Sequence, residues 1–461
     1  MDFNQNSNYD TLLEKWEPLL AHESMPSIQD SYKKKVTAVL LENQEVALRQ
    51  QYISEASTMG GGFNTTAAAG VGSQGNLAGY DPILISLVRR SMPNLMAYDI
   101  AGVQPMSAPT GLIFAMRSRY DGSTLGKEAL FQEAFAQYSG KGNTSIGVAT
   151  LASEGIDPTL NTGSGIRGNT FSMANFRGML TGEGEMLSNT SSPIFKEMGF
   201  SIERIAVEAK TRALKAEYTT ELAQDLKAVH GLDAESELAN ILSTEILNEI
   251  NRELMYTLYR VAKTGAASSD LDAFSAGGGV YDLNVDSDGR WSAERFRGLM
   301  FQIEREANVI AKETRRGKGN FIVCSSDVAS ALAMGGFLNV SPALNVQLEV
   351  DDTGNTFAGI LNGKFKVYID PYAKTDANFC MVGYRGASPY DAGVFYCPYV
   401  PLQMVRAVDQ NTFQPKIGFK TRYGMVQNPF AEVQGINQIG GNQYYRIFQV
   451  KNLHGNTGFG L

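Results

Sequence analysis

The chain has 461 residues, 43% of them hydrophobic and 19% charged, so it can build two or three domain-like units around buried cores. A formal net charge of −8 weighs against a protein that coats nucleic acid non-specifically, because such binding needs an excess of Lys and Arg. Three widely spaced cysteines without a CxxC pair (Cys324, Cys380 and Cys397) favour a cytoplasmic folding environment over a disulfide framework, and neither a signal peptide nor a membrane span is expected.

The first 55 residues are the most acidic part of the chain. Nine acidic and five basic side chains give them a net charge of −4, half of the total. The stretch SYKKKVTAVLLENQEVALRQQ has apolar residues near helical spacing, with Lys early and Glu late, which is the reverse of what the helix dipole favours. It predicts either a helix that leans on a partner or an ordinary solvated N-terminal helix.

Residues 56–80 carry no charge and seven glycines, so they cannot fold around a core of their own and are expected to form an extended arm or a flexible linker. A short helix is predicted between Pro82 and Pro93. The stretch GLIFAMRSRY alternates as a strand, with Leu112, Phe114 and Met116 on one face and Arg117 and Arg119 on the other. The Gly-, Ser- and Thr-rich residues 121–192 indicate a long β-hairpin projection or a small insertion.

Three long helices are predicted next. The first covers residues 201–230, with an apolar stripe at spacings of four, four, four and three that ends at Gly231; the stripe is Leu214, Tyr218, Leu222, Leu226 and Val229. The second starts after a cap at Asp233, carries the stripe Leu238 to Leu258 and ends by Gly265. The third runs from about Ser292 to Lys312.

After Gly319 the apolar period changes to two, and NFIVC, FKVYI, FCMVGY, GVFYCPYV and LQMVR are predicted as strands. One helix, SDVASALAMG, interrupts them. Long helices followed by a strand-rich portion predict the α+β class.

Catalytic and metal-binding motifs are not apparent in the sequence. The three histidines lie far apart, and GxSxG, HExxH, Walker A and kinase signatures do not occur, so no enzyme activity, metal or cofactor is expected. The glycine cluster GSGIRG at 163–168 lacks the strand and Lys-Ser/Thr of a phosphate loop. NVDSDGRWSAE fails the calcium-loop pattern and predicts a turn before a helix at Ser292. KETRRGKGN at 312–320 fits a solvated helix end, with contact to phosphate or an acidic partner as the alternative.

Several long stretches carry a family resemblance: AQDLKAVHGLDAESEL, EINRE, RRGKGNFIVCS, FAGILNGKFKVYIDPYAK, YDAGVFYCPYVPL and FQPKIGFKTRYGMVQNPFAE. They closely resemble the major capsid protein of T4-type tailed bacteriophages, over about residues 80–120 and 195–461. The resemblance implies an HK97-type capsid fold and a subunit that self-assembles into hexamers of an icosahedral head around double-stranded DNA. An encapsulin-like nanocompartment shell protein is the alternative.

The resemblance also implies a division of the chain. It gives a cleavable propeptide at 1–55, an N-terminal arm at 56–110, an E-loop at 111–195 with a shortened or divergent insertion, a P domain at 196–300, mainly A domain at 301–415, and a return to the P domain at 416–461. The spine helix of the P domain is expected at 201–230, and the E-loop is expected to return through NTFSMANF.

Processing and partners are implied in the same way. The family's prohead protease cuts after Glu in a Leu/Ile-x-Glu context, which Ile53, Ser54 and Glu55 match, with Ala56 following. Leu12, Leu40 and Leu247 start further matches, but the composition changes at Glu55–Ala56, where an extended segment would present the bond. Expected partners are neighbouring capsomers, the protease and scaffold core, vertex and accessory head proteins, and packaged DNA bound non-specifically. The location is the virion, and the host cytoplasm during assembly.

Overall fold

The computed structural model describes residues 3–21, 28, 30–58, 89, 95–120, 129–130, 139, 181–185, 195–266, 278–287, 291–336, 338–340, 357–374, 377–388, 390–409, 412–429 and 440–453. The chain divides into two compact units. The first contains Met1–Leu112, Ala206–Glu313 and Gly317–Leu461, and the second contains Ile113–Ile205 and Thr314–Arg316. Within the described ranges, no helix is both long and apolar enough to cross a membrane.

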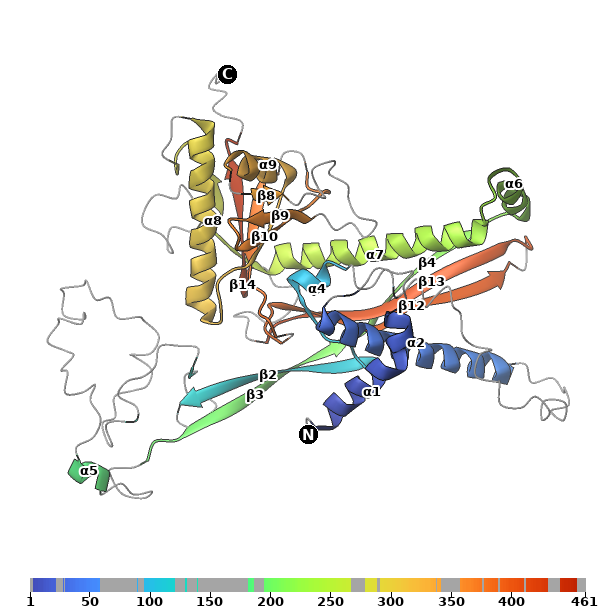
Figure 1. Cartoon of the computed structure of the whole chain (residues 1–461), viewed down its shortest axis with the longest axis horizontal. Coiled ribbons are helices and arrows are strands. Elements are labelled where there is room, and N and C mark those ends of the chain that lie inside the picture. Colours follow the sequence, from blue (N-terminus) through green and yellow to red (C-terminus); the bar gives the residue numbers. More distant parts are fainter. Residues whose placement is uncertain are drawn as a thin grey trace. The chain divides into compact units, whose positions relative to one another are not determined.

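The first unit contains an eight-stranded sheet with helices α8 and α9. The strand order is β5-β14-β11-β7-β10-β9-β8, and β6 pairs with β14. The strands are β5 (Ala262–Thr264), β6 (Val280–Asp282), β7 (Phe321–Cys324), β8 (Leu338–Val340), β9 (Phe357–Leu361), β10 (Phe365–Ile369), β11 (Phe379–Gly383) and β14 (Asn442–Lys451). Helix α8 (Ser292–Thr314) runs along this sheet and α9 (Ser326–Met334) follows β7 (Figure 1).

A four-stranded sheet of order β1-β12-β13-β4 lies in the same unit. It contains β1 (Gly102–Val103), β12 (Val394–Val408), β13 (Pro415–Gln427) and β4 (Lys210–Glu217), and β1 and β4 are its edge strands. Strands β12 and β13 form a long antiparallel hairpin, and β4 adds to β13 with Leu214 opposite Phe419. The predicted strands GVFYCPYV and LQMVR are therefore one continuous strand, β12.

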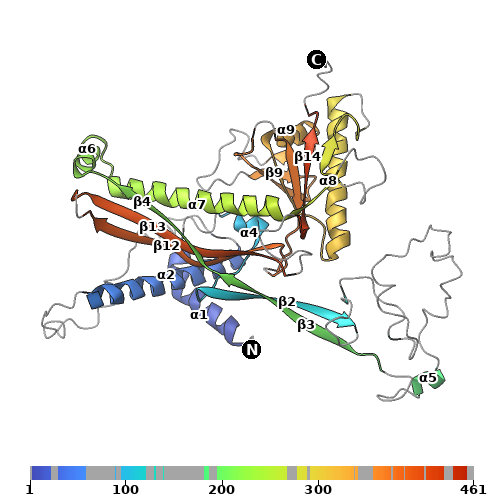
Figure 2. The ribbon, with the colours of Figure 1, turned by 180° about the vertical axis from the view of Figure 1, so that it is seen from behind.

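Helix α7 (Ala234–Val261), 28 residues long, packs beside the four-stranded sheet, as Figures 1 and 2 both show. Its N-cap is Asp233, as the sequence predicts, and its apolar stripe is buried: Leu242, Ile246, Ile250, Leu254 and Leu258. It ends at Val261 because the chain turns directly into β5. Burying five such side chains contributes on the order of 10 kcal/mol of hydrophobic free energy to folding. The predictions for α7, α8 and α9 are confirmed.

The helix predicted at 201–230 is wrong over most of its length. Residues 198–217 form β3 (Met198–Glu208) and β4, and only α6 (Thr220–His230) is helical. A spacing of four keeps residues on one face of a strand as well as of a helix, so Leu214 and Tyr218 fitted both. Only the final step of three, from Leu226 to Val229, distinguishes a helix, and that step lies in α6. The expected spine helix is therefore not at 201–230.

The second unit contains most of a two-stranded ribbon of β2 (Thr110–Tyr120) and β3, together with α5 (Thr181–Glu185); Thr110–Leu112 and Ala206–Glu208 of the ribbon belong to the first unit. Leu112 and Phe114 share one exposed face of β2, as predicted, and Arg119 on the opposite face pairs with Glu203 at 3.1 Å. The strand that pairs with β2 is β3. The predicted return of the E-loop through NTFSMANF stays a prediction, because residues 169–176 lie outside the described residues.

Candidate functional site: the N-terminal segment and its docking surface

The predicted processing residues lie near the end of α2 (Ser31–Thr58). Ile53, Glu55 and Ala56 are all helical, and their side chains are outside the described part. The expectation that an extended segment presents the Glu55–Ala56 bond is therefore wrong, because the helix continues three residues past Glu55. Ala and Glu are good helix formers, and the glycines that end helical propensity start only at Gly60. A protease would have to unwind the last turn of α2 to reach this bond.

The competing Leu-x-Glu matches lie in more strongly held positions. Leu40 and Leu247 are 1% and 2% exposed and belong to the interiors of α2 and α7. Glu249 is in addition paired with Arg212 at 3.0 Å. The match that starts at Leu12 lies in α1 (Phe3–Leu20). Of these matches Glu55 is the closest to a helix end, where fraying costs least.

Helices α1 and α2, here called the N-terminal hairpin, pack against the rest of the first unit. Its buried apolar side chains, which share the main core cluster, are Trp16, Leu20, Val36, Ala38, Leu40 and Leu41. Lys15 links the two helices through Glu42 at 2.7 Å and Glu45 at 2.6 Å. Of the two interpretations of the SYKKK stretch, the helix that leans on a partner is confirmed, and the partner is the chain's own body.

Polar contacts fix the hairpin to α4 (Ala97–Ile100), β1 and β12, which we call the dock. The Tyr32 hydroxyl donates to the carbonyl oxygen of Val103. The Asn43 amide donates to the carbonyl oxygens of Met106 at 2.9 Å and Tyr399 at 3.0 Å. Lys33 lies 3.7 Å from the Asp99 carboxylate. Sequence analysis missed these residues, because their partners lie 71, 63 and 356 positions away along the chain.

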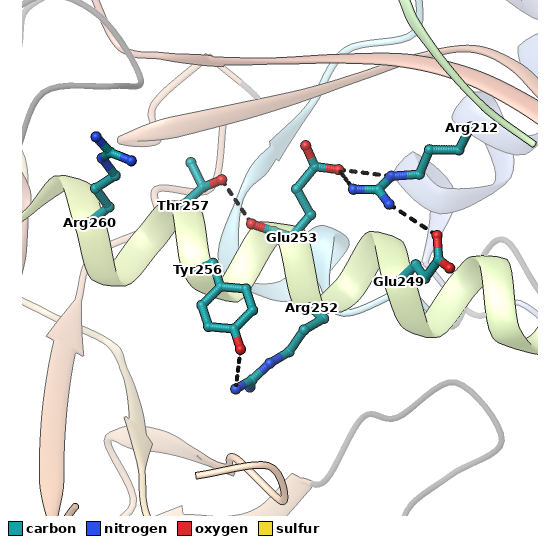
Figure 3. Close-up of a pocket in the computed structure, with 7 residues that line it drawn as sticks. All are labelled: Arg212, Glu249, Arg252, Glu253, Tyr256, Thr257 and Arg260. Atoms are coloured by element: carbon teal, nitrogen blue, oxygen red, sulfur yellow. Dashed lines mark hydrogen bonds and ion pairs between the residues drawn. The ribbon is translucent and has the colours of Figure 1, made fainter. Parts of the chain in front are cut away.

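A groove of about 420 Å³ runs along α7 (Figure 3). It is lined by Arg212, Glu249, Arg252, Glu253, Tyr256, Thr257 and Arg260. Its charged groups have partners within the chain: Arg252 contacts both carboxylate oxygens of Asp370, at 2.7 and 2.8 Å, and lies over the ring of Tyr256. The charged side chains of the groove therefore hold parts of the chain together and do not form an array of groups available to bind a substrate.

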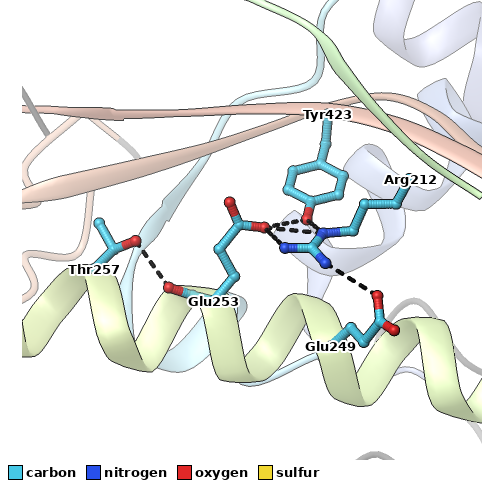
Figure 4. Close-up of polar contacts among 5 residues, drawn as sticks. All are labelled: Arg212, Glu249, Glu253, Thr257 and Tyr423. Atoms are coloured by element: carbon cyan, nitrogen blue, oxygen red, sulfur yellow. Dashed lines mark hydrogen bonds and ion pairs between the residues drawn. The ribbon is translucent and has the colours of Figure 1, made fainter. Parts of the chain in front are cut away.

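Arg212 is the strongest of these braces, and Figure 4 shows its guanidinium between Glu249 and Glu253, with the Tyr423 hydroxyl beside it. Burial alone would lower the pKa of Arg212, but its hydrogen bond with Glu253 raises the pKa overall. Burial, reinforced by Glu253, raises the pKa of Tyr423. Arg212 thus stays charged and Tyr423 neutral at pH 7, and together they tie β4 and β13 to α7.

The other stretches weighed in the sequence behave as turns and helix ends. Asp286 accepts a hydrogen bond from the amide of Asp282 at 2.9 Å, and α8 starts at Ser292 as predicted. Lys312 lies in the last turn of α8, as expected for a helix end. In the described residues, no group of three or more His, Cys, Asp or Glu side chains could hold a metal ion, and the three cysteines are free and buried. The cluster at 163–168 lies outside the described residues.

Comparison with known proteins identifies the family. A family model described as Major capsid protein Gp23 matches residues 77–450, most of the chain. The chain belongs to the Gp23 major capsid protein family. It is a structural subunit of a tailed-phage head, and the encapsulin alternative is not favoured. The matched residues start after the N-terminal hairpin.

Relatives of the Gp23 family align over nearly the whole chain. The major capsid protein of Enterobacteria phage T4 is 37% identical over 520 residues, covering 96% of this chain and 98% of the T4 protein. That of Vibrio phage KVP40 is also 37% identical, covering 96% of this chain and 100% of the relative. The T4 alignment is longer than this chain's 461 residues, so the T4 protein carries segments that this chain lacks.

More distant likenesses also come from phage heads. The capsid vertex protein of phage T4 is 30% identical over 245 residues, or 50% of this chain and 53% of the vertex protein. A solved structure, the capsid of Myoviridae phage XM1, covers 77% of this chain and 92% of its own at 8% identity and a TM-score of 0.37. At that TM-score the family assignment of this chain rests on its sequence, and the described elements confirm the α+β class.

Proposed function

We propose that this Gp23-family chain self-assembles as hexamers into an icosahedral shell with an HK97-type organisation. The N-terminal arm would be residues 56–110 and the E-loop 111–195. Helix α7 replaces residues 201–230 as the proposed spine helix. The proposed A domain corresponds best to the eight-stranded sheet with α8 and α9, in which case it includes β14 from the C-terminal residues.

The observation that carries self-assembly is the apolar face of the β2–β3 ribbon. Its side chains are large and exposed: Leu112 50%, Phe114 55%, Met198 55%, Phe200 70% and Ile202 60%. An isolated two-stranded ribbon is at best marginally stable in water, and contiguous apolar surface of this kind marks a protein interface. The ribbon therefore supplies what a shell subunit needs, an apolar surface that a second copy covers.

Removing apolar surface from this face tests the proposal. Phe200→Ser with Ile202→Ser should abolish shell formation while the unfolding midpoint of the unassembled chain stays within about 2 °C, since exposed substitutions change stability by roughly 0.5 kcal/mol or less. Electron microscopy and sedimentation would measure the shells. Phe200→Leu with Ile202→Val keeps the apolar surface and should assemble. Normal shells from the double Ser variant would contradict the role given to the ribbon.

We also propose that the chain is processed between Glu55 and Ala56, after the Ile53-Ser54-Glu55 match. The position near the end of α2 and the change of composition support this site. The cut would remove a net charge of −4 and leave residues 56–461 at −4. Loss of that segment would bias the lattice towards an expanded arrangement through rigid-body movement of packed subunits.

Intact-mass measurement of the protein from purified particles tests the processing site. We expect a mass for residues 56–461 with Ala56 as the new N-terminus, and a full-length chain in precursor particles. Glu55→Ala should leave full-length subunits, whereas Glu45→Ala should be cut normally. Full-length subunits in DNA-filled particles would overturn this part of the proposal.

The remaining partners follow from the same proposal. The prohead protease and scaffold core would act on the precursor in the host cytoplasm, and vertex and accessory head proteins would join the shell. The mildly acidic chain would contact packaged double-stranded DNA only non-specifically, since a strongly basic lining would trap the genome. We expect neither enzyme activity nor a requirement for a cofactor or metal, and turnover by the unassembled chain should be nil.

A further inference from the structure

The N-terminal hairpin is bound to the dock by contacts that all lie before the proposed cut. The buried side chains of the hairpin run from Trp16 to Ala47, and its hydrogen bonds to the dock come from Tyr32 and Asn43. A residue outside the hairpin also binds it: Arg89, which is 1% exposed, donates a hydrogen bond to the carbonyl oxygen of Leu20, at the end of α1, at 2.9 Å. A cut after Glu55 therefore severs the chain without removing any of these contacts.

The edge of the four-stranded sheet explains why a helix, rather than a strand, occupies the dock. The amides of Gln104 and Met106 point to β12, where they donate to Tyr396 and Pro398 at 2.9 Å each. The alternate residues face away from β12, and one of them is Pro105, which has no N–H. An added strand needs donors and acceptors in turn. This edge lacks a donor at Pro105 and offers the carbonyl of Val103, which accepts from the Tyr32 hydroxyl. Asn43 instead bridges the carbonyls of Met106 and of Tyr399 in β12.

The docked hairpin also contains a weak point. Gln44 is 0% exposed, and both polar atoms of its side-chain amide lack a hydrogen-bond partner. Burying an amide without a partner opposes packing, because the group loses its hydrogen bonds to water. The buried position of Gln44 therefore holds the hairpin less tightly than an apolar side chain of the same size would.

We propose that the dock is a binding site for residues 1–55 as a separate peptide, so that the cut segment leaves the processed chain by dissociation rather than at the moment of cleavage. Before the cut, the covalent connection between the hairpin and the body keeps the hairpin at a high effective concentration. After the cut, occupancy of the dock depends on the concentration of free segment, and Gln44 sets an affinity low enough for release. The biological setting rests on the proposed cut at Glu55, whereas the binding itself does not.

The test uses the full chain with a site for a sequence-specific protease inserted between Glu55 and Ala56. A fluorophore on the N-terminus follows the segment. After complete cleavage at micromolar concentration the label should co-elute with the body in gel filtration. A chase with excess unlabelled peptide of residues 1–55 then gives the dissociation rate. Immediate separation of label and body in the unmutated chain would overturn the proposal.

Two sets of variants should move the dissociation rate in opposite directions. Tyr32→Phe with Asn43→Ala removes the hairpin's side-chain donors to Val103, Met106 and Tyr399 and should speed release about tenfold or more. Gln44→Met keeps the volume, removes the unpartnered amide and should slow release by about tenfold. Lys35→Ala, an exposed position on the same helix, is the matched control and should change nothing. Equal rates in all variants would overturn the assigned contacts.

The outcomes separate this inference from the proposed function. Because the inserted site replaces the natural cut, loss of trans binding would leave processing at Glu55 intact. Conversely, particles whose subunits keep residues 1–55 would refute natural processing without affecting binding measured in this way.

Discussion

The eight-stranded sheet buries its apolar side chains, whereas the β2–β3 ribbon exposes several of them. In the sheet, strand β7 has all four residues buried, and α8 buries Leu299, Ile303, Ala307 and Ile310 against the core. In the ribbon, Phe200 and Ile202 are mostly exposed. The first region completes its burial within one chain, whereas the second exposes apolar side chains that, in the proposed function, a second copy covers. We therefore expect substitutions in the eight-stranded sheet to change the stability of the chain, and substitutions on the apolar face of the ribbon to change its assembly.

The largest expected effect is on the sheet-containing unit at high pH. Burial raises the pKa of several of its tyrosines above the ordinary value, and Tyr281 reaches about 12; the others include Tyr98, Tyr259, Tyr368, Tyr396 and Tyr445. Since the folded state keeps these protons longer than the unfolded state, their contribution to stability is fully present below about pH 10 and is lost as pH rises through the folded-state pKa values.

We therefore expect this unit to unfold between about pH 10 and 12, with the buried tyrosines ionising together as it unfolds. Denaturant midpoints measured from pH 8 to 12, with tyrosinate absorbance followed in parallel, would check this. If all tyrosines ionised near pH 10 while the chain stayed folded, burial in the sheet would not be controlling stability, and the contrast with the ribbon would fail.

The next effect concerns the buried ion pair between β14 and α8. Arg446 and Glu306 are 2% and 1% exposed, and Arg446 Nε lies 2.9 Å from Glu306 Oε2. The other oxygen of Glu306 accepts from the amide of Ala266 at 2.7 Å and from Gln302 at 2.8 Å. Removing one partner leaves a buried charge uncompensated, so Arg446→Ala should lower the free energy of unfolding by about 3–5 kcal/mol.

Chemical denaturation of the unassembled chain measures this loss. Lys451→Ala, an exposed change on the same strand, should cost less than about 0.5 kcal/mol. Arg446→Met combined with Glu306→Gln removes both charges and should recover much of the loss. Arg446→Ala chains that fold at low temperature should still form shells, because the ribbon is unchanged. Loss of assembly without loss of stability would place Arg446 in an interface instead.

The sequence predicts an element well when the residues that determine it lie close together along the chain. Helices α7, α8 and α9 carry their apolar stripes within their own sequence, and the strands of the sheet show their period directly. Residues 201–218 were misassigned because a repeat of four satisfies both periods. The dock could not be predicted from the sequence. Asn43 contacts Tyr399 only in the folded chain, and the residues next to Asn43 in the sequence do not distinguish it from a surface residue. Processing at Glu55 remains a prediction from the family's sequence pattern.

The smallest expected effect is at α6, which resembles the apolar face of the ribbon in being exposed, since none of its residues is buried. Its N-cap is Thr219, whose hydroxyl accepts from the amide of Leu222 at 3.2 Å. Thr219→Ala should therefore destabilise α6 by about 1 kcal/mol. Because so little of the core depends on α6, this loss should appear as faster hydrogen exchange of α6 amides, with the global unfolding midpoint unchanged.

Thr220→Ala, one residue further along and inside the helix, leaves the cap in place and should not speed that exchange. A fall in the global midpoint with Thr219→Ala would mean that α6 unfolds together with the core. In that case the distinction between regions that are stable within one chain and regions that need a second molecule would not apply to α6. Exposure of side chains alone would then not identify the surfaces that are buried on assembly.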